Sequence, residues 1–518
     1  MDGDNAAQAL LLNPSSARCS LQSIACKLIA NHHMRASEPP MSIPTTAWTP
    51  EKPTATVEPC GIFPAWTTPP AWTPPAWADG VREGYILLSN DAHDGPLPSL
   101  GNGFVSTIAD SSDVYLAGVF SSLQKPLQSH RAKFPSAHRV TVTPEGGWPS
   151  DVRAARALDT RHGLFLSAWS SASAQINVTA QLYAHRARRG LLVSDVQVHA
   201  ETDTTTAVRA GQQHPQQWLR SEHIHFNSPA AVAVGVAGAH GLTVHGETGS
   251  KAWAARHPPV KTNVSLVYSV PPDNLHVRGG QGGGTTLRVL SSFASNLTEA
   301  GGTPFEAAAA AHAAALATTP ADLYAEHCKA WERLYSSALG GGRLDVRGPS
   351  GEATRLTRVV GASLYAILSA VRTDAPYGLS PGGLSTDGYK GHTFWDQETW
   401  MLPPLLALAP TPLAASVLQY RARTVEGAYE KAEEFGYRGA MFAWESCVTG
   451  TDQYWFGDCG IYEHHITADI GMAFEQCACR ASSLGPHPPL LCVPSLLTRL
   501  RSLVAQTLAA DWQRHVAW

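Results

Sequence analysis

Apolar and polar residues alternate along the first large part of the chain, between residues 81 and 300. A period of two is typical of strands in an antiparallel sheet, and turns rich in Gly and Pro separate the alternating segments. The clearest segments are Arg139–Thr143, Ile176–His185, Leu191–Ala200, Asn263–Val270 and Thr286–Phe293. We therefore predict a large antiparallel β-sandwich over this part of the chain.

The spacing of the apolar residues becomes helical near residue 300. Phe305–Leu339 is rich in Ala and is interrupted near Pro320, which predicts a broken helical stretch. In Ala353–Arg372 the apolar residues form one broad stripe, as on a helix that packs against a core. Further helices are predicted at Gln397–Leu408, Pro412–Glu434, His464–Ser483 and Pro494–Ala517. The chain is thus predicted to be a β part followed by an α part.

Residues 1–80 show neither period, and we predict a disordered extension rich in Pro and Trp. Phe63–Trp77 repeats a P-A-W unit, and proline favours extended conformations. Asn5–Ser37 contains no Asp or Glu but several basic residues, as transit peptides do. A disordered extension and an imprecise start site are the alternatives, so targeting to an organelle stays open.

Composition narrows the classes of function. A chain of 518 residues is too long for one core, so two or more domains are expected. The net charge is −4 and the Lys and Arg residues are scattered, which gives no electrostatic basis for binding nucleic acid or an anionic membrane. Nine unevenly spread cysteines favour free thiols in the cytoplasm, and Cys477 and Cys479 lack zinc spacing. The oligomeric state is not indicated.

Residues suited to chemistry gather in Gly388–Pro410. Trp395 and Asp396 are adjacent there, and an indole face together with a carboxylate is a recurring means of binding a sugar ring and its hydroxyls. His392 and Lys390 lie just before them on a Gly-rich approach. The alternatives are that Asp396 only caps the next helix and that Trp395 only packs in the core.

Two further segments carry aromatic and acidic residues at predicted helix starts. Gly436–Asp452 holds Trp444 and Glu445, and Tyr462–Phe474 holds Glu463. Taken singly, Glu445 could be a solvated or capping carboxylate, and Glu463 a charge favoured by the helix dipole. Three such segments in sequence favour a shared site.

The segments LSTDGYKGHTFWDQETWMLPPLL, GYRGAMFAWESCVTG and EHHITADI resemble, in order, the signature segments of glycoside hydrolase family 65. The resemblance implies a β-supersandwich at 81–300, a helical linker at 301–350 and, from 351 to 518, an (α/α) toroid like that of six-hairpin glycosidases. It also assigns Trp395 and Asp396 to the glucosyl unit, with Lys390, His392, Trp444 and Glu445 lining the same pocket.

The general acid of the family lies in a segment resembling G-P-D-E-[YF]-H, which the sequence lacks. The family order places that segment after the helix resembling Leu496–Trp518, so we expect a toroid truncated at its C-terminal side. Glu463 is kept as a candidate catalytic residue, although its segment precedes the acid in the family.

The sequence is therefore compatible with three functions. The first is inverting hydrolysis of an α-glucoside, either glucosylgalactosyl-hydroxylysine or a trehalose-like sugar. The second is phosphorolysis of an α-glucosyl disaccharide, and the third is residual sugar binding by a catalytically incomplete fragment. A carbohydrate is the expected partner. No metal or cofactor is expected, apart from inorganic phosphate for a phosphorylase.

Overall fold

A computed structural model describes most of the chain between residues 72 and 483. The described residues are 72–89, 97–121, 129–136, 138–210, 225–226, 239–246, 260–280, 284–297, 302–338, 346, 351–453, 463 and 465–483. The chain divides into two units, Met1–Trp66 and Thr67–Trp518, and all of the described residues belong to the second. Most of the predicted extension and the predicted helix Pro494–Ala517 lie outside the described residues.

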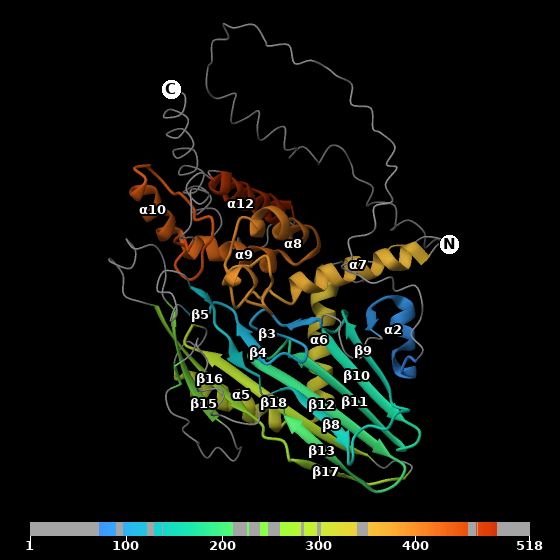
Figure 1. Cartoon of the computed structure of the whole chain (residues 1–518). Helices are drawn as coiled ribbons and strands as arrows, with labels where there is room; N and C mark the ends of the chain where they lie inside the picture. The colour runs from blue at the N-terminus through green and yellow to red at the C-terminus, as the bar shows by residue number, and fades with distance from the viewer. Residues whose placement is uncertain are drawn as a thin grey trace. The chain divides into compact units, whose positions relative to one another are not determined.

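A nine-stranded antiparallel sheet forms the centre of the β part (Figure 1). Its strands, in spatial order, are β1 (Ile86–Ser89), β9 (Arg153–Asp159), β10 (Leu164–Ser171), β11 (Ile176–Ala184), β12 (Leu191–Ala200), β18 (Thr285–Ser295), β16 (Val260–Tyr268), β15 (Ala239–Gly246) and β14 (His225–Phe226). Each strand predicted from the alternating pattern in this region is present, which confirms the period-two interpretation.

Smaller sheets pack against this large one. They are β17 (Asn274–Val277), β13 (Thr204–Ala210) and β8 (Val140–Pro144); β2 (Ser99–Gly101), β3 (Val105–Ile108), β4 (Asp113–Leu116) and β7 (Phe134–Pro135); and β5 (Phe120–Ser121) with β6 (His130–Arg131). Val142 and Val208 of the three-stranded sheet share an apolar cluster with Val178 and Val196 of the large sheet. Two sheets that bury one face against each other make a β-sandwich, as predicted.

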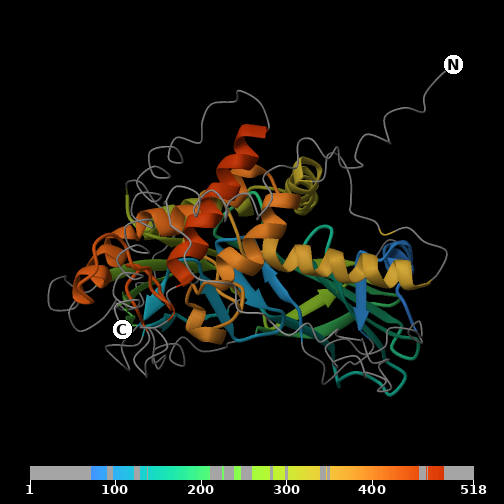
Figure 2. The ribbon, with the colours of Figure 1, turned by 90° about the horizontal axis from the view of Figure 1, so that it is seen from above.

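The described helices of the α part follow the strands in the chain. They are α5 (Pro304–Leu316), α6 (Pro320–Ala338), α7 (Gly351–Leu368), α8 (Leu402–Leu408), α9 (Thr411–Arg423), α10 (Val425–Glu434) and α12 (His465–Ser483), with short turns η2 (Gly388–Gly391) and η3 (Gln397–Met401). A capping box between Thr303 and Glu306 starts α5, which packs on β16 and β18. Figure 2 shows the helices after residue 350, in orange and red, lying over the strands.

Two predicted helices differ from those observed. The predicted helix Pro412–Glu434 is divided into α9 and α10, because Thr424 leaves the helical conformation and its hydroxyl donates to the Tyr420 carbonyl. The predicted helix Gln397–Leu408 starts with a π-helical turn, and α8 follows with proline in its first turn. Proline is tolerated there because its missing N–H would be unpaired anyway.

The predicted boundary of the N-terminal extension at residue 80 needs correction. Residues 75–77 form the 3₁₀ turn η1 (Pro75–Trp77), and α2 (Ala78–Glu83) follows directly. Trp77 is buried in a cluster with Ile86, Leu88 and Ala157. The repeat of Pro and Trp suggested an extended tail, but the tertiary contacts of one indole place these residues in the folded part.

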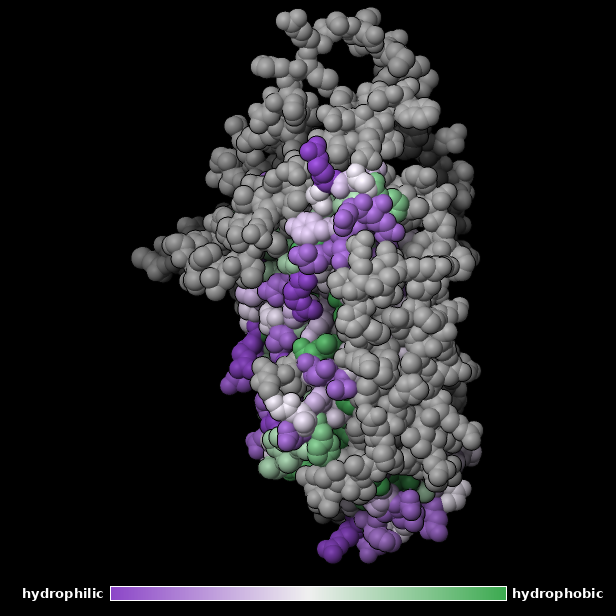
Figure 3. All heavy atoms as spheres, turned by 90° about the vertical axis from the view of Figure 1, so that its left-hand side faces the viewer, coloured by the Kyte–Doolittle hydropathy of each residue, from purple (hydrophilic) through white to green (hydrophobic). Residues whose placement is uncertain are grey.

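One apolar cluster joins the sheets to the helices. It contains Phe104 and Leu192 from the β part together with Trp331 of α6, Leu364 of α7 and Leu405 of α8. On the face shown in Figure 3, the described residues are mainly hydrophilic, and the hydrophobic ones form small groups. Among the helices that the structure describes, none is both long and apolar enough to cross a bilayer.

Candidate active site

The Gly-rich approach to the first motif wraps around a buried arginine. Arg131 of β6 donates hydrogen bonds to the carbonyls of Gly383 (2.6 Å), Thr386 (3.0 Å) and Gly391 (3.0 Å). Within the turn η2, Tyr389 and Lys390 both adopt φ of 54°, which is uncommon for residues with a side chain. Tyr389 is also 64% exposed.

The first and second motif segments lie side by side. Thr393 and Ser446 exchange two backbone hydrogen bonds of 2.8 and 3.0 Å in an antiparallel bridge. The ring of Phe394 meets that of the half-buried Trp444 edge-on, with centroids 5.5 Å apart. Tertiary structure therefore joins segments that are about fifty residues apart in the sequence.

His392 and Glu445, both predicted to contact substrate, bind each other. His392 Nδ1 lies 2.6 Å from Glu445 Oε1, and His392 Nε2 lies 3.0 Å from the hydroxyl of Ser129. Both side chains are buried. Burial lowers the pKa of His392, and the hydrogen bond and charge of Glu445 oppose that shift. The pair supports the junction of the two motifs, and its contact with substrate stays a prediction.

A second buried pair, Glu398 and Arg421, was not predicted from the sequence. Glu398 accepts two hydrogen bonds from Arg421 of α9, at 2.9 and 3.0 Å, and both side chains are buried. Gln397 also donates to Glu398 at 2.6 Å, and Arg421 donates to the Phe394 carbonyl at 3.0 Å. Glu398 lies inside the first motif, but no local signal indicated that Arg421 would be its partner.

Trp395 and Asp396 are half-buried at the start of η3. Trp395 contacts the ring of His465 edge-on, with centroids 4.9 Å apart, and lies near Trp400, which is 66% exposed. Asp396 makes no side-chain capping bond to the helix it precedes, so the helix-cap alternative is wrong. Within the described ranges, its carboxylate has no hydrogen bond or ion pair.

Glu463 reaches this region through His465. Its carboxylate lies 2.5 Å from His465 Nε2, and Asp469 lies 2.6 Å from His465 Nδ1. Burial alone would lower the pKa of His465, but the hydrogen bonds and charges of Asp469 and Glu463 outweigh it and raise the pKa. The geometry lets Glu463 orient His465 against Trp395, and its catalytic role stays a prediction.

Lys390 is half-buried, and its positive charge helps to lower the pKa of His392, so it lies near the His392–Glu445 pair. The predicted residues therefore fall into two adjoining groups. One holds Trp395, Asp396 and Glu463, linked by His465. The other holds Lys390, His392, Trp444 and Glu445. No cluster of three or more potential metal-ligating side chains is found in the described part of the chain.

Residues 362–481, which contain all three motif segments, match the central catalytic domain of glycosyl hydrolase family 65. The chain is therefore a relative of the family 65 glycoside hydrolases, and the resemblance predicted from its motifs is confirmed. The protein-glucosylgalactosylhydroxylysine glucosidase of Dictyostelium discoideum is 30% identical over 433 residues, which cover 79% of this chain and 55% of that protein. The chain thus spans about half the length of such relatives.

Two shorter similarities cover the motif region. A kojibiose hydrolase of Flavobacterium johnsoniae is 36% identical over 151 residues, covering 29% of this chain and 21% of that protein. A kojibiose phosphorylase of Halothermothrix orenii is 34% identical over 165 residues, covering 29% and 20%. A solved structure of a candidate kojibiose phosphorylase from the human microbiome aligns with a TM-score of 0.58 at 16% identity, covering 76% of this chain and 56% of that one. That similarity supports a β-sandwich followed by a helical domain.

Proposed function

We propose that the protein is an inverting α-glucoside hydrolase in which Trp395 and Asp396 hold the glucosyl unit. The observation that carries the proposal is the half-buried Asp396 carboxylate, which has no partner among the described residues and follows an aromatic residue. An indole stacks on the C–H face of a sugar, and a carboxylate accepts charge-assisted hydrogen bonds from its hydroxyls.

The substrate that we propose is glucosylgalactosyl-hydroxylysine or a small α-glucosyl disaccharide. The support is that relatives named for the first substrate and for kojibiose share the motif region with this chain. We also propose that residues 351–518 contribute to an (α/α) toroid and that residues 301–350 link it to the β-sandwich of residues 81–300.

Inverting hydrolysis needs an acid at the glycosidic oxygen and a base at the water on the opposite face, with carboxyl groups about 6.5–9.5 Å apart. In this proposal Asp396 binds and orients the sugar, and Glu463, which also contacts His465 beside Trp395, is the candidate catalytic carboxylate. The sequence contains no match to the family's general-acid segment, so none of the described residues is assigned as that acid. The buried His392–Glu445 pair keeps the two motif loops in register beneath the sugar. Lys390 and Trp444 line the same pocket.

A phosphorylase is the second candidate, because a kojibiose phosphorylase matches the motif region about as well as a kojibiose hydrolase does. In a phosphorylase, inorganic phosphate takes the place of the base and its water. The two candidates give different products: a hydrolase releases free glucose, and a phosphorylase releases glucose 1-phosphate.

The test measures binding and turnover separately. The chain is titrated with kojibiose, trehalose and glucosylgalactosyl-hydroxylysine while its tryptophan fluorescence is recorded, and the products are analysed with and without phosphate. Asp396→Asn should weaken sugar binding at least about tenfold, because it removes charge-assisted hydrogen bonds. Glu426→Gln, an exposed carboxylate of α10, is the matched control and should bind as the wild type does. Unchanged affinity of Asp396→Asn would refute the assignment of Asp396.

A further inference from the structure

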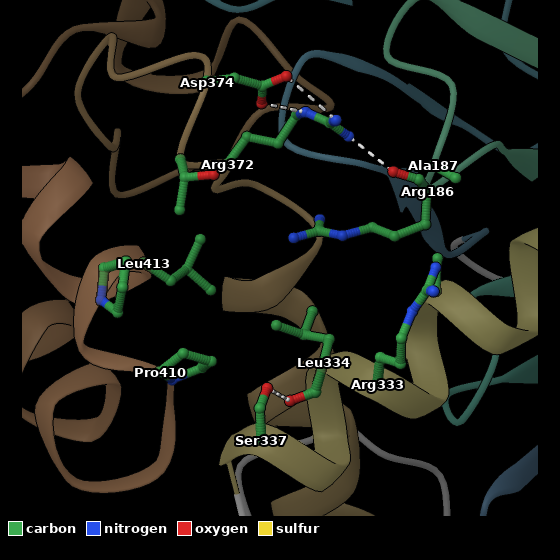
Figure 4. Close-up of a pocket in the computed structure, with 12 residues that line it drawn as sticks. Arg186, Ala187, Arg333, Leu334, Ser337, Arg372, Asp374, Pro410 and Leu413 are labelled. Carbon is green, nitrogen blue, oxygen red and sulfur yellow. Dashed lines mark hydrogen bonds and ion pairs between the residues drawn. The ribbon is translucent and has the colours of Figure 1, made fainter.

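A second candidate site is a cavity of about 460 Å³ (Figure 4). Its walls come from the turn after β11, from α6, from the segment after α7 and from the start of α9. The residues that line it are Arg186, Ala187, Ala330, Arg333, Leu334, Ser337, Arg372, Thr373, Asp374, Pro410, Pro412 and Leu413. None of the residues assigned above to the sugar site is among them.

Positive charge dominates this cavity. Three arginines line it with one aspartate, so two positive charges are in excess. The aspartate, Asp374, accepts hydrogen bonds from Arg372 at 2.5 and 3.2 Å, and Arg189 lies 3.7 Å from it. Its negative charge is therefore already neutralised, and Arg186 and Arg333 determine the electrostatic potential of the cavity.

Arg186 is a buried cation, and among the described residues its side-chain hydrogen bonds all go to uncharged groups. Its side chain donates to the carbonyls of Asn102 (2.9 Å), Leu368 (3.0 Å) and Val371 (3.2 Å), and its guanidinium lies over the ring of Trp331. Arg186 is only 9% exposed. Burial and, to a lesser extent, the charge of Arg372 lower its pKa to about 9. A bound anion would stabilise this charge.

Arg333 offers a guanidinium that is free to bind a ligand. Arg333 is an exposed residue of α6, and its side chain makes no hydrogen bond or ion pair with any residue that the structure describes. Figure 4 shows Arg186 and Arg333 on one side of the cavity, facing Pro410 and Leu413 on the other. The cavity thus combines unpaired positive charge with an apolar wall.

We propose that this cavity binds a small phosphate monoester, with its phosphoryl group on Arg333 and Arg186 and its organic part against Pro410 and Leu413. Guanidinium groups bind phosphate through paired hydrogen bonds, and a phosphate monoester carries close to two negative charges at neutral pH, which matches the excess of the lining. The volume lies within the range of small-molecule sites. The proposal does not depend on the function of the sugar site.

The test uses isothermal titration calorimetry on the chain at pH 7.5 and low ionic strength, in a buffer without phosphate. Phenyl phosphate is the probe, and inorganic phosphate and benzoate are compared with it. We expect saturable binding of phenyl phosphate to one site, at least about tenfold tighter than the binding of benzoate. Benzoate carries one negative charge fewer, so it makes fewer charge-assisted hydrogen bonds with the arginines. Inorganic phosphate should bind more weakly than phenyl phosphate because it makes no apolar contact.

Two variants and a control locate the binding. Arg333→Ala should weaken the binding of phenyl phosphate at least about tenfold. Ala330→Glu adds a carboxylate to the cavity wall and should abolish the binding. Arg278→Ala removes another exposed arginine, which lies outside the cavity lining, and this variant should bind as the wild type does. Absence of saturable binding, or equal weakening by Arg333→Ala and Arg278→Ala, would overturn the site. If inorganic phosphate bound as tightly as phenyl phosphate, the assignment of the ligand as an ester would be wrong. If benzoate bound as tightly as phenyl phosphate, the preference for a phosphoryl group would be wrong.

Discussion

At the scale of single residues, the buried pair of Glu398 and Arg421 holds the first motif in place. Glu398 directly follows the π-turn residue Gln397, and Arg421 also supports the carbonyl of Phe394, next to Trp395. The backbone next to the proposed sugar-binding residues is therefore supported by a charged pair that is out of contact with solvent. Loss of one partner would leave the other charge buried and unpaired.

We predict that Glu398→Ala lowers the free energy of unfolding by about 3–5 kcal/mol, as expected when one member of a buried pair is removed. The measurement is urea denaturation followed by circular dichroism. Glu352→Ala breaks an exposed pair with Arg355 and should cost far less stability, because solvent screens that pair. Similar losses in the two variants would mean that the buried pair contributes little.

At the scale of elements, the turn η2 is shaped by a contact with the β part. Gly391 has φ of 72°, and a Cβ built there would lie 2.6 Å from the Cβ of Arg131 and 2.7 Å from its Nε. Gly383 has nearly the same φ, 71°, but a Cβ there meets nothing within 4 Å. Substitutions at these two glycines therefore allow the cost of backbone strain to be measured separately from the cost of a steric clash.

We predict that Gly383→Ala costs about 1–2 kcal/mol of stability through its left-handed conformation alone. Gly391→Ala should cost about 1–3 kcal/mol more, because its methyl group must displace the buried Arg131 side chain. Thermal unfolding of the two variants and the wild type provides the comparison. If Gly391→Ala proves no less stable than Gly383→Ala, Arg131 does not constrain the turn.

At the scale of the whole molecule, buried histidines connect the β-sandwich to the helices that pack on it. His185 accepts a hydrogen bond from the backbone of Arg188 and contacts the Leu323 carbonyl of α6, and His312 of α5 lies near Ser292 of β18. Burial lowers the pKa of His138, His185 and His312 to about 4 in each case. Folding therefore favours their neutral forms.

We predict a loss of stability in mild acid. The pKa of an unfolded histidine is about 6.5, so the unfolded chain takes up protons before the folded one does as the pH falls. Stability should be fully present above pH 6.5 and decrease between about pH 6.5 and 4, as measured by the urea midpoint at each pH. His185→Gln should reduce this dependence, whereas His276→Gln, at an exposed position, should leave it unchanged. A midpoint independent of pH in this range would contradict the prediction.

Local pattern was enough to predict most elements, but not how some of them end. The alternation in Ile176–His185 and Leu191–Ala200 predicted β11 and β12. Successive side chains of a strand point to opposite faces of the sheet, so the pattern of apolar and polar residues is visible within each strand's own sequence. The break at Thr424 and the burial of Trp77 depend on contacts with distant residues, so the periodic pattern could not indicate them.

The amino-acid sequence was sufficient to predict the β-then-α organisation, the family relationship and the segments that carry Trp395, Asp396, Glu445 and Glu463. These follow from periods and motifs that are contiguous in the chain. The folded structure was needed to show that His392 binds Glu445, that Arg421 binds Glu398, and that Arg186 and Arg333 line one cavity. Such contacts join residues far apart in the sequence, and a buried charge can be paired only by the particular groups that folding brings within hydrogen-bonding distance.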